Sequence, residues 1–259
     1  MTKRNDLIKF IMDFFGAEEI QKAQKLDTHG ANGLQIKGNS NVTGIALGVS
    51  ADLEFFQKAV REDLNFLIVH HGLRLTDVNF AINEILKSRL KFLFDNNLTL
   101  TGFHYILDSH RKIGHNAVVL NQLGAKIVKP FYEDWGWIGE LKHEMIRSDI
   151  IERCTKIYAC TPISFLYGKK EIKTIAVVSG AGFIHPYTDI STQIMEGIDL
   201  YITGVPTDTT EETCREGKIN YLAYGHYNTE VIGIKALGEI IKKAFPGLPI
   251  KFIEIPNKL

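Results

Sequence analysis

The chain has 259 residues, of which 45% are hydrophobic and 23% are charged, so a sizeable core is expected in one large domain or two ordinary ones. Lys plus Arg and Asp plus Glu each number 30, which gives a formal net charge of zero. A neutral chain has no overall electrostatic attraction to nucleic acid or to an anionic membrane. The composition therefore counts against nucleic acid as a partner.

The cysteine content and the N-terminal segment indicate the compartment. Cys154, Cys160 and Cys214 cannot all pair, and none lies in a Cys-x-x-Cys spacing, which is typical of a reducing environment. The apolar stretch at the N-terminus is interrupted by charges, unlike that of a signal peptide. No window approaches the ~18 uninterrupted apolar residues of a membrane-spanning helix. We therefore expect a soluble, cytoplasmic protein with no membrane partner.

Helical and strand patterns alternate along the first half of the chain. The expected elements are a helix at 7–14, a strand at 42–49, a helix at 53–60, a strand at 65–69, a helix at 82–93 and a strand at 98–107. The run at 65–69 is continuously apolar, which is typical of a strand buried on both faces. This alternation predicts an α/β fold with mostly parallel pairing.

The second half repeats the alternation after a stretch of weaker pattern between Gly124 and Ile172. The expected strands lie at 174–178, 200–203 and 221–224, and the expected helices at 191–196, 210–217 and 228–243. We therefore predict two similar α/β halves with mixed, mostly parallel sheets. The N-terminal half is expected at residues 1–125 and the C-terminal half at 126–259, where the second can interlock with the first.

The first group of residues with metal-binding chemistry is His70-His71-Gly72, directly after the buried strand. Ligand groups in parallel-sheet proteins lie just past the carboxyl ends of the strands. Neighbouring side chains of a strand point to opposite faces, so both histidines serve one site only if the chain turns there, which Gly72 permits. The alternative is an ordinary histidine pair in a loop.

The second group is His104, Asp108 and His110, at the end of the next strand. If that strand continues, its period of two places His104 and Asp108 on one face, where they could bind metal or form a histidine oriented by an aspartate. The alternative is a turn, because Asp108-Ser109 is common in turns and exposed histidines there need no further role.

The third group is Gly225-His226-Tyr227-Asn228-Thr229-Glu230, between a predicted strand and the last helix. Asn228 or Thr229 is a good N-cap, which would place Glu230 in the first turn and His226 just before the helix. Two ligands four residues apart at such a junction can bind one ion. The alternative is a glutamate stabilised there by the helix dipole alone.

The three groups together are stronger evidence for a metal site than any one of them alone. Each follows a predicted strand, and each supplies the nitrogen and oxygen ligands that suit Zn, Mn, Fe or Co. Two carboxylates and three imidazoles exceed the needs of a tetrahedral structural zinc. They fit a centre of two divalent metal ions that keep open coordination positions, of the kind that activates water for hydrolysis.

These motifs belong to a longer series with a familiar order and spacing. In chain order they are Asn32-Gly33-Leu34-Gln35, His70-His71-Gly72, His104, Leu107-Asp108-Ser109-His110, Gly114-His115-Asn116-Ala117, Ser179-Gly180-Ala181-Gly182, Ile202-Thr203-Gly204 and Gly225-His226-Tyr227-Asn228-Thr229-Glu230. On these residues the chain resembles the Nif-three-like family, whose members are often named GTP cyclohydrolase 1 type 2 homologues. The resemblance covers nearly the whole chain, in the short form that has no inserted middle domain.

The resemblance implies a ligand set and an assembly. It implies that His70, His71, Asp108, His226 and Glu230 bind two divalent metal ions per chain between the two halves, with Glu230 as a candidate for the bridging ligand. His104, the candidate catalytic residue, would lie beside the site, in contact with the substrate or with residues that hold the metal ligands. The resemblance also implies a homo-hexameric ring whose sites face an internal cavity.

The chain departs from the family pattern at two places. It has Asp27-Thr28-His29-Gly30-Ala31-Asn32 where members commonly have Trp-Asp-Asn, and Val205 where they often have glutamate. These changes leave the ligand set intact, and they alter the polarity of the pocket rim. The family's substrate contacts therefore do not transfer to this chain residue by residue.

The leading hypothesis for function is a metal-dependent hydrolase that acts on a nucleotide or a related small molecule, similar to GTP cyclohydrolase by the resemblance. The alternative is a metal-handling or regulatory protein without turnover. The turn at Ser179-Gly180-Ala181-Gly182 offers backbone N–H groups that could bind a phosphate, or it is simply a tight turn after a strand.

Overall fold

The computed structural model describes residues 2–78 and 81–257. The chain forms two compact units: unit 1 is Met1–Leu107 with Ile234–Ile255, and unit 2 is Asp108–Gly233 with Pro256–Leu259. The chain passes from one unit to the other within the short helix α5 (Tyr105–Ser109) and within α10 (His226–Ala244). The predicted domain boundary at 125/126 falls inside unit 2, at the start of its first strand.

Unit 1 is built on a five-stranded sheet with the order β13-β4-β5-β6-β2. Its strands are β2 (Asn32–Ile36), β4 (Ile45–Ser50), β5 (Phe66–His71), β6 (Thr99–Phe103) and β13 (Ile250–Phe252), and a separate pair is formed by β1 (Thr2–Lys3) and β3 (Asn41–Val42). The four strands β13, β4, β5 and β6 are parallel, and β2 is antiparallel to β6. The prediction of a parallel core around the apolar run at 65–69 is confirmed.

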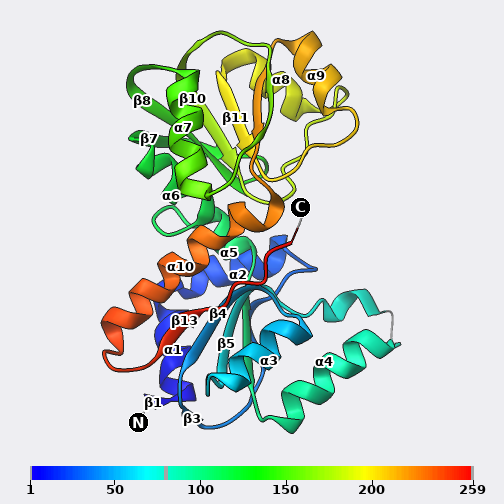
Figure 1. Cartoon of the computed structure of the whole chain (residues 1–259), viewed down its shortest axis with the longest axis vertical. Helices are drawn as coiled ribbons and strands as arrows, with labels where there is room; N and C mark the ends of the chain where they lie inside the picture. Colours follow the sequence, from blue (N-terminus) through cyan, green and yellow to red (C-terminus); the bar gives the residue numbers. More distant parts are fainter. Residues whose placement is uncertain (1, 79–80, 258–259) are drawn as a thin grey trace. The chain divides into compact units, whose positions relative to one another are not determined.

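Helices cover both faces of this sheet (Figure 1). They are α1 (Arg4–Phe15), α2 (Ala17–Leu26), α3 (Leu53–Arg61), α4 (Glu84–Asp95) and the second part of α10, and a 3-10 turn lies at Leu75–Val78. Phe55 and Phe56 of α3 pack with Leu67 of β5 in one apolar cluster. On the other face the ring of Phe15 in α1 lies 5.1 Å from that of Phe103 in β6. Burial on both faces explains the continuous apolar sequence of β5.

Unit 2 is built on a six-stranded sheet with the order β7-β8-β10-β11-β12-β9. Its strands are β7 (Ala125–Phe131), β8 (Gly136–Ile146), β9 (Ile163–Leu166), β10 (Glu171–Val178), β11 (Leu200–Thr203) and β12 (Asn220–Ala223). The central strands β10, β11 and β12 are parallel, whereas β7, β8 and β9 join antiparallel. Both units therefore have the mixed sheets that the sequence predicts.

Helices also cover both faces of the second sheet (Figure 1). They are α6 (His115–Gln122), α7 (Arg147–Tyr158), α8 (Asp189–Gly197) and α9 (Thr210–Gly217). Leu120 of α6 and Cys154 of α7 share an apolar cluster with Val177 of β10. Ile194 of α8 and Cys214 of α9 belong to a second cluster. Each unit is thus an α/β sandwich, and the predicted fold class of two similar α/β halves is confirmed.

The strand predicted at 98–107 is wrong at its end, because β6 stops at Phe103 and α5 begins at Tyr105. Two side chains of unit 1 hold the start of this helix. Asp27 Oδ2 accepts the Tyr105 N–H at 3.4 Å and Asn32 Oδ1 accepts the Ile106 N–H at 3.1 Å. Such acceptors satisfy the first N–H groups of a helix, which have no partner within it. The apolar run 105–107 is therefore helical.

The stretch of weak pattern between 124 and 172 contains β7, β8, α7 and β9. Its strands lack a clean alternation for local reasons. The register of β7 against β8 shifts between Ile127 and Lys129, and Val128 beside this bulge is 46% exposed. Strand β9 lies at the sheet edge, where Ile163 is 53% exposed. Bulged and edge strands do not need one buried face, so their periodicity is weak.

Candidate metal centre

The three histidines of unit 1 lie at the carboxyl ends of two neighbouring parallel strands. His70 and His71 are the last residues of β5, and His104 follows β6 directly. The ring centroids of His70 lie 4.7 Å from His71 and 4.8 Å from His104, and one ring nitrogen of each lies within 4.8 Å of the others. The strand does not turn before His71, so the predicted turn between the two histidines is not needed.

The orientation of His70 suits a metal ligand. Its side chain is fully buried, and Nδ1 lies 3.0 Å from the carbonyl oxygen of Phe103. A carbonyl only accepts hydrogen bonds, so Nδ1 carries the proton and Nε2 carries the lone pair. Metal-binding histidines commonly use this arrangement, in which the second ring nitrogen donates to a carbonyl or carboxylate. His71 Nδ1 lies 3.3 Å from the hydroxyl oxygen of Ser50.

His104 is oriented by Asp27, a residue that the sequence did not indicate. Its Nδ1 lies 2.7 Å from Asp27 Oδ2, across 77 residues of chain. Asp27 is itself held, because Gly30 N donates to Oδ1 at 2.7 Å and Asn32 Nδ2 donates to Oδ2 at 3.0 Å. A Cβ on Gly30 would overlap both Asp27 and His104, so only glycine fits there. The hypothesis of a histidine oriented by an aspartate holds, with Asp27 rather than Asp108 as the aspartate.

The environment of Asp27 stabilises its charged form. Burial by itself raises the pKa of this carboxyl, but the hydrogen bond and charge of His104, with the donors of Gly30 and Asn32, outweigh burial and leave the pKa well below its ordinary value. A buried carboxylate with several donors remains ionised at neutral pH. Asp27 therefore holds His104 in one orientation, with Nδ1 protonated.

We expect Asp27→Asn to lower the free energy of unfolding by about 1–3 kcal/mol at neutral pH, since it replaces charge-assisted hydrogen bonds by neutral ones. Because the folded-state pKa of Asp27 lies below its unfolded value, this stability is present above about pH 4 and is lost as the pH falls through the folded pKa. Urea unfolding of both proteins between pH 7 and pH 3 checks this. A difference that stays constant down to pH 3 would contradict the ionised form.

His226 and Glu230 lie one turn apart on the same face of α10 in unit 2. Helix α10 begins at His226, two residues before the predicted start, and His226 Nε2 lies 3.2 Å from Glu230 Oε1. The hydrogen bond that His226 donates to Glu230 raises the pKa of His226 above its ordinary value despite the opposing effect of burial. Glu230 is only 3% exposed. The predicted pairing of these two residues at a strand-to-helix junction is therefore seen in the structure.

The predicted caps of α10 have a different role. Asn228 donates through Nδ2 to Tyr224 O at 3.0 Å, and the hydroxyl of Thr229 lies 3.0 Å from Gly225 O and 2.8 Å from His226 O. Both side chains therefore bond back toward the loop that precedes the helix. Thr229 also accepts the Gly180 N–H at 2.9 Å, which ties the first turn of α10 to the end of β10.

Asp108 lies in α5 and is held by two residues of unit 2. Its Oδ1 accepts the Ser179 hydroxyl at 2.7 Å, and its carbonyl oxygen accepts Asn116 Nδ2 at 3.1 Å. Asn116 in turn accepts the Ser179 N–H through Oδ1 at 2.7 Å. All three residues are buried, with Asp108 4% exposed. His110, the neighbour considered with Asp108, accepts the N–H groups of Lys112 and Ile113 through Nδ1, so its role is the turn.

The unit 2 residues gather at the carboxyl ends of its three parallel strands. Gly180 follows β10, Gly204 follows β11 and Gly225 follows β12. Gly204 N donates to Gly180 O at 3.0 Å, and Gly225 N donates to Gly204 O at 2.8 Å. The loops are therefore hydrogen-bonded to one another, and they hold Ser179 and the first turn of α10 on one edge of the sheet. This is the edge at which parallel sheets bind ligands.

The turn at 179–182 is a structural turn rather than a phosphate cradle. The N–H of Ser179 donates to Asn116, that of Gly180 to Thr229 and that of Gly182 to Thr203 Oγ1 at 3.1 Å. Donors that already bond to protein side chains are not available to a phosphate without breaking those bonds. Of the two interpretations of this motif, the tight turn is the one that the hydrogen bonds support.

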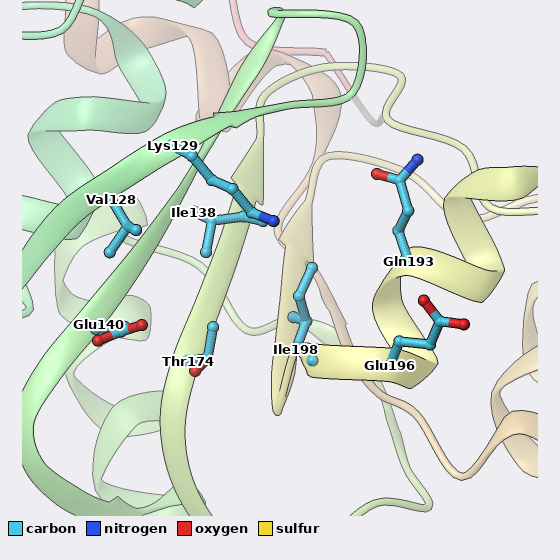
Figure 2. Close-up of a pocket in the computed structure, with 9 residues that line it drawn as sticks. Val128, Lys129, Ile138, Glu140, Thr174, Gln193, Glu196 and Ile198 are labelled. Carbon is cyan, nitrogen blue, oxygen red and sulfur yellow. The ribbon is translucent and has the colours of Figure 1, made fainter.

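A separate cavity of about 400 Å³ lies on the α8 face of unit 2 (Figure 2). It is lined by β7, β8, β10 and α8, with Lys129, Gln193 and Glu196 among its polar side chains. Thr174 on its wall lies near the start of β10, whereas Ser179 follows the end of that strand. The two places are about 16 Å apart along an extended strand. The cavity is therefore distinct from the ligand residues.

The side chains of each unit fit divalent metal chemistry. Unit 1 brings three imidazoles together, and unit 2 supplies a partly exposed histidine paired with a buried glutamate, and a buried aspartate. Imidazole nitrogen and carboxylate oxygen are the ligands that suit Zn, Mn, Fe and Co. All six predicted site residues thus lie at strand ends or in the helices that follow them, in two sets. That His70, His71, Asp108, His226 and Glu230 bind the same two ions stays a prediction.

Comparison with known proteins supplies the family. Residues 2–258 match the model of the family Duf34/NIF3 (NGG1p interacting factor 3). The chain belongs to this family. Because the match covers nearly the whole chain, the resemblance inferred from the motifs is confirmed.

Relatives of this Duf34/NIF3 chain match it from end to end. A protein of Archaeoglobus fulgidus named GTP cyclohydrolase 1 type 2 homolog is 31% identical over 258 residues, which cover 98% of each chain. A protein of Pyrococcus abyssi with the same name is 31% identical over 265 residues, covering 99% of this chain and 100% of the relative. The solved structure of protein ybgI, described as of unknown function, is 28% identical and superposes with a TM-score of 0.84 over all of both chains.

Among residues 2–78 and 81–257, no helix combines the length and the apolar character needed to cross a bilayer. This agrees with the absence of a long apolar run in the sequence.

Proposed function

We propose that this Duf34/NIF3 protein binds two divalent metal ions through His70, His71, Asp108, His226 and Glu230, and hydrolyses a nucleotide or a related small molecule. The observation that carries the proposal is the cluster of three histidines at the ends of β5 and β6, with His70 held in the tautomer of a metal ligand. The pairing of the partly exposed His226 with the buried Glu230 supports it, because a buried carboxylate needs a cationic partner.

The residues of the chain have separate roles in this proposal. Bound divalent ions would supply a water of lowered pKa and polarise the bond under attack. His104 is the residue proposed to move a proton, since Asp27 fixes its Nδ1–H and leaves Nε2 as the basic nitrogen. The hydrogen bond to Asp27 keeps the ring in one orientation, so the proton would enter and leave through Nε2.

The substrate class rests on the relatives. Those that match this chain over nearly their whole length carry the name GTP cyclohydrolase 1 type 2 homolog, which points to a purine nucleotide as the first substrate to test. In this chain the N–H groups of Ser179, Gly180 and Gly182 bond to protein side chains. Selectivity for a nucleotide is therefore proposed to come from its base rather than from a backbone phosphate site in this loop.

The first test is metal content by elemental analysis of protein purified without an affinity tag. We expect close to two ions per chain in the wild type and in His143→Ala, a control at an exposed histidine of β8. Asp108→Ala and His226→Ala are expected to lose at least one ion. A wild type that contains almost no metal and does not take up Zn, Mn, Fe or Co would overturn the proposal.

The second test separates a hydrolase from a metal-handling protein. Wild type loaded with each metal is incubated with GTP and other nucleotides, and the products are separated by chromatography. Saturable turnover that Asp108→Ala abolishes supports the hydrolase. Reversible metal exchange without turnover of any nucleotide would favour the metal-handling or regulatory function.

The hexameric ring and the cytoplasmic location stay predictions. Light scattering of the purified protein measures the oligomeric state.

A further inference from the structure

Ser179 connects the turn after β10 to one of the proposed metal ligands. Its hydroxyl donates to Asp108 Oδ1 at 2.7 Å, and the two residues are 71 positions apart in the chain. Ser179 is 8% exposed and Asp108 is 4% exposed, so water competes little with this bond. A hydroxyl that donates to a carboxylate forms a short, charge-assisted bond, which is stronger than a bond between neutral groups.

The backbone around this bond is fixed from both sides. Asn116 donates to the carbonyl oxygen of Asp108 and accepts the N–H of Ser179, so it links the same two residues a second time. Asn116 is fully buried and also donates to Trp135 O at 2.9 Å. The next residue, Gly180, is bonded through its N–H to Thr229. Ser179 is therefore held in place before any ion binds.

We infer that Ser179 is a positioning residue that holds Asp108 Oδ1 and so directs the other carboxylate oxygen, Oδ2, to a metal ion. The inference rests on the proposed function, because it presupposes that Asp108 is a ligand. The hydroxyl restricts rotation of the carboxylate, and it withdraws Oδ1 from competition for the ion. Asp108 would then bind through a single oxygen. Partners of this kind typically contribute about 10–100-fold to metal affinity.

The test compares Ser179→Ala with Ser191→Ala as a matched control. Ser191 is also a buried serine of unit 2, 2% exposed, and its hydroxyl donates to His185 O at 2.7 Å. Each variant thus loses one hydroxyl and one hydrogen bond of a buried serine, but only Ser179 bonds to a proposed ligand. Ser179→Thr keeps the hydroxyl and serves as the rescue variant.

The measurement is the affinity of the metal-free proteins for Zn²⁺, by competition with a chromophoric chelator. We expect Ser179→Ala to bind one of its two ions about 10–100-fold more weakly. Ser191→Ala and Ser179→Thr are expected to bind both as the wild type does. The absorption bands of bound Co²⁺ provide a second reading, and they should change in Ser179→Ala alone, because the coordination of one ion is altered. Wild-type affinity and an unchanged Co²⁺ spectrum in Ser179→Ala would overturn the inference.

A double variant separates positioning from general destabilisation. If Ser179 acts through Asp108, then adding Ser179→Ala to Asp108→Ala leaves the remaining Zn²⁺ affinity unchanged. An equal further loss in the Asp108→Ala background would show a structural role and overturn the inference. Melting curves of the metal-free proteins establish that they fold. If Ser179→Ala does not fold, Ser179→Gly is used in its place. A wild type that binds no metal would instead overturn the proposed function, before Ser179 is considered.

Discussion

Replacing Glu230 by glutamine is expected to weaken metal binding more than ~100-fold. This exceeds the loss expected for a residue that only hydrogen-bonds to a metal ligand. Glu230 is 3% exposed and lies 3.2 Å from His226 Nε2. Glutamine has nearly the same volume, but its neutral amide offers one weakly basic oxygen in place of two anionic ones. The proposed site would therefore lose the charge that compensates its ions, while the packing around α10 is kept.

The control for this variant lies on the same helix. Glu239→Gln removes the same charge from an exposed position of α10 and is expected to bind two ions as the wild type does. Zn²⁺ affinity and elemental analysis of both variants measure the effect. The metal-free Glu230→Gln protein should still melt cooperatively, because the variant removes a buried charge without leaving a cavity. Two ions bound with wild-type affinity by Glu230→Gln would exclude Glu230 from the site.

Gly180→Ala is expected to lower the free energy of unfolding by about 2–5 kcal/mol and to reduce metal binding at the same time. Gly180 has a φ of +64°, which alanine adopts only at a cost. A Cβ at this position would overlap Glu230 Oε1 and lie 3.2 Å from His226 Nε2. The added methyl group therefore strains the backbone and displaces the carboxylate as well.

Gly124→Ala separates these two effects. Gly124 has a φ of +78°, and a Cβ there would meet no heavy atom within 4 Å. This control is expected to lose about 1–2 kcal/mol from backbone strain alone and to keep its metal affinity. Urea unfolding of the metal-free proteins gives the loss in free energy of unfolding for Gly180→Ala and for Gly124→Ala. Equal losses in the two variants, with metal binding intact in both, would mean that Glu230 moves aside without consequence for the site.

Much of the fold was predictable because its signals are local. The apolar run of β5 and the strands β10, β11 and β12 are short, continuous and buried, and each was predicted within two or three residues of its observed bounds. The rule that ligands follow the carboxyl ends of parallel strands then placed His70, His71 and His226 correctly at strand ends. These predictions needed only the order of residues along the chain.

Other elements could not be predicted, because contacts from elsewhere in the chain decide them. Residues 105–107 are apolar enough for a strand, yet Asp27 and Asn32 bind the N–H groups that start a helix there. The hairpin of β7 and β8 has weak periodicity because its pairing contains register shifts. No window of local sequence contains the partners that produce these features.

The amino-acid sequence by itself determined the fold class, the family and the set of residues that we propose as metal ligands, since these depend on residue type and on local spacing. The tertiary structure decided which residue holds each of them in place. Asp27 meets His104 across 77 residues, and Ser179 meets Asp108 across 71. Each of these bonds forms because packing brings together two segments that are distant in the sequence. A hydrogen bond between distant residues leaves no periodic trace in the sequence, so only the folded chain reveals it.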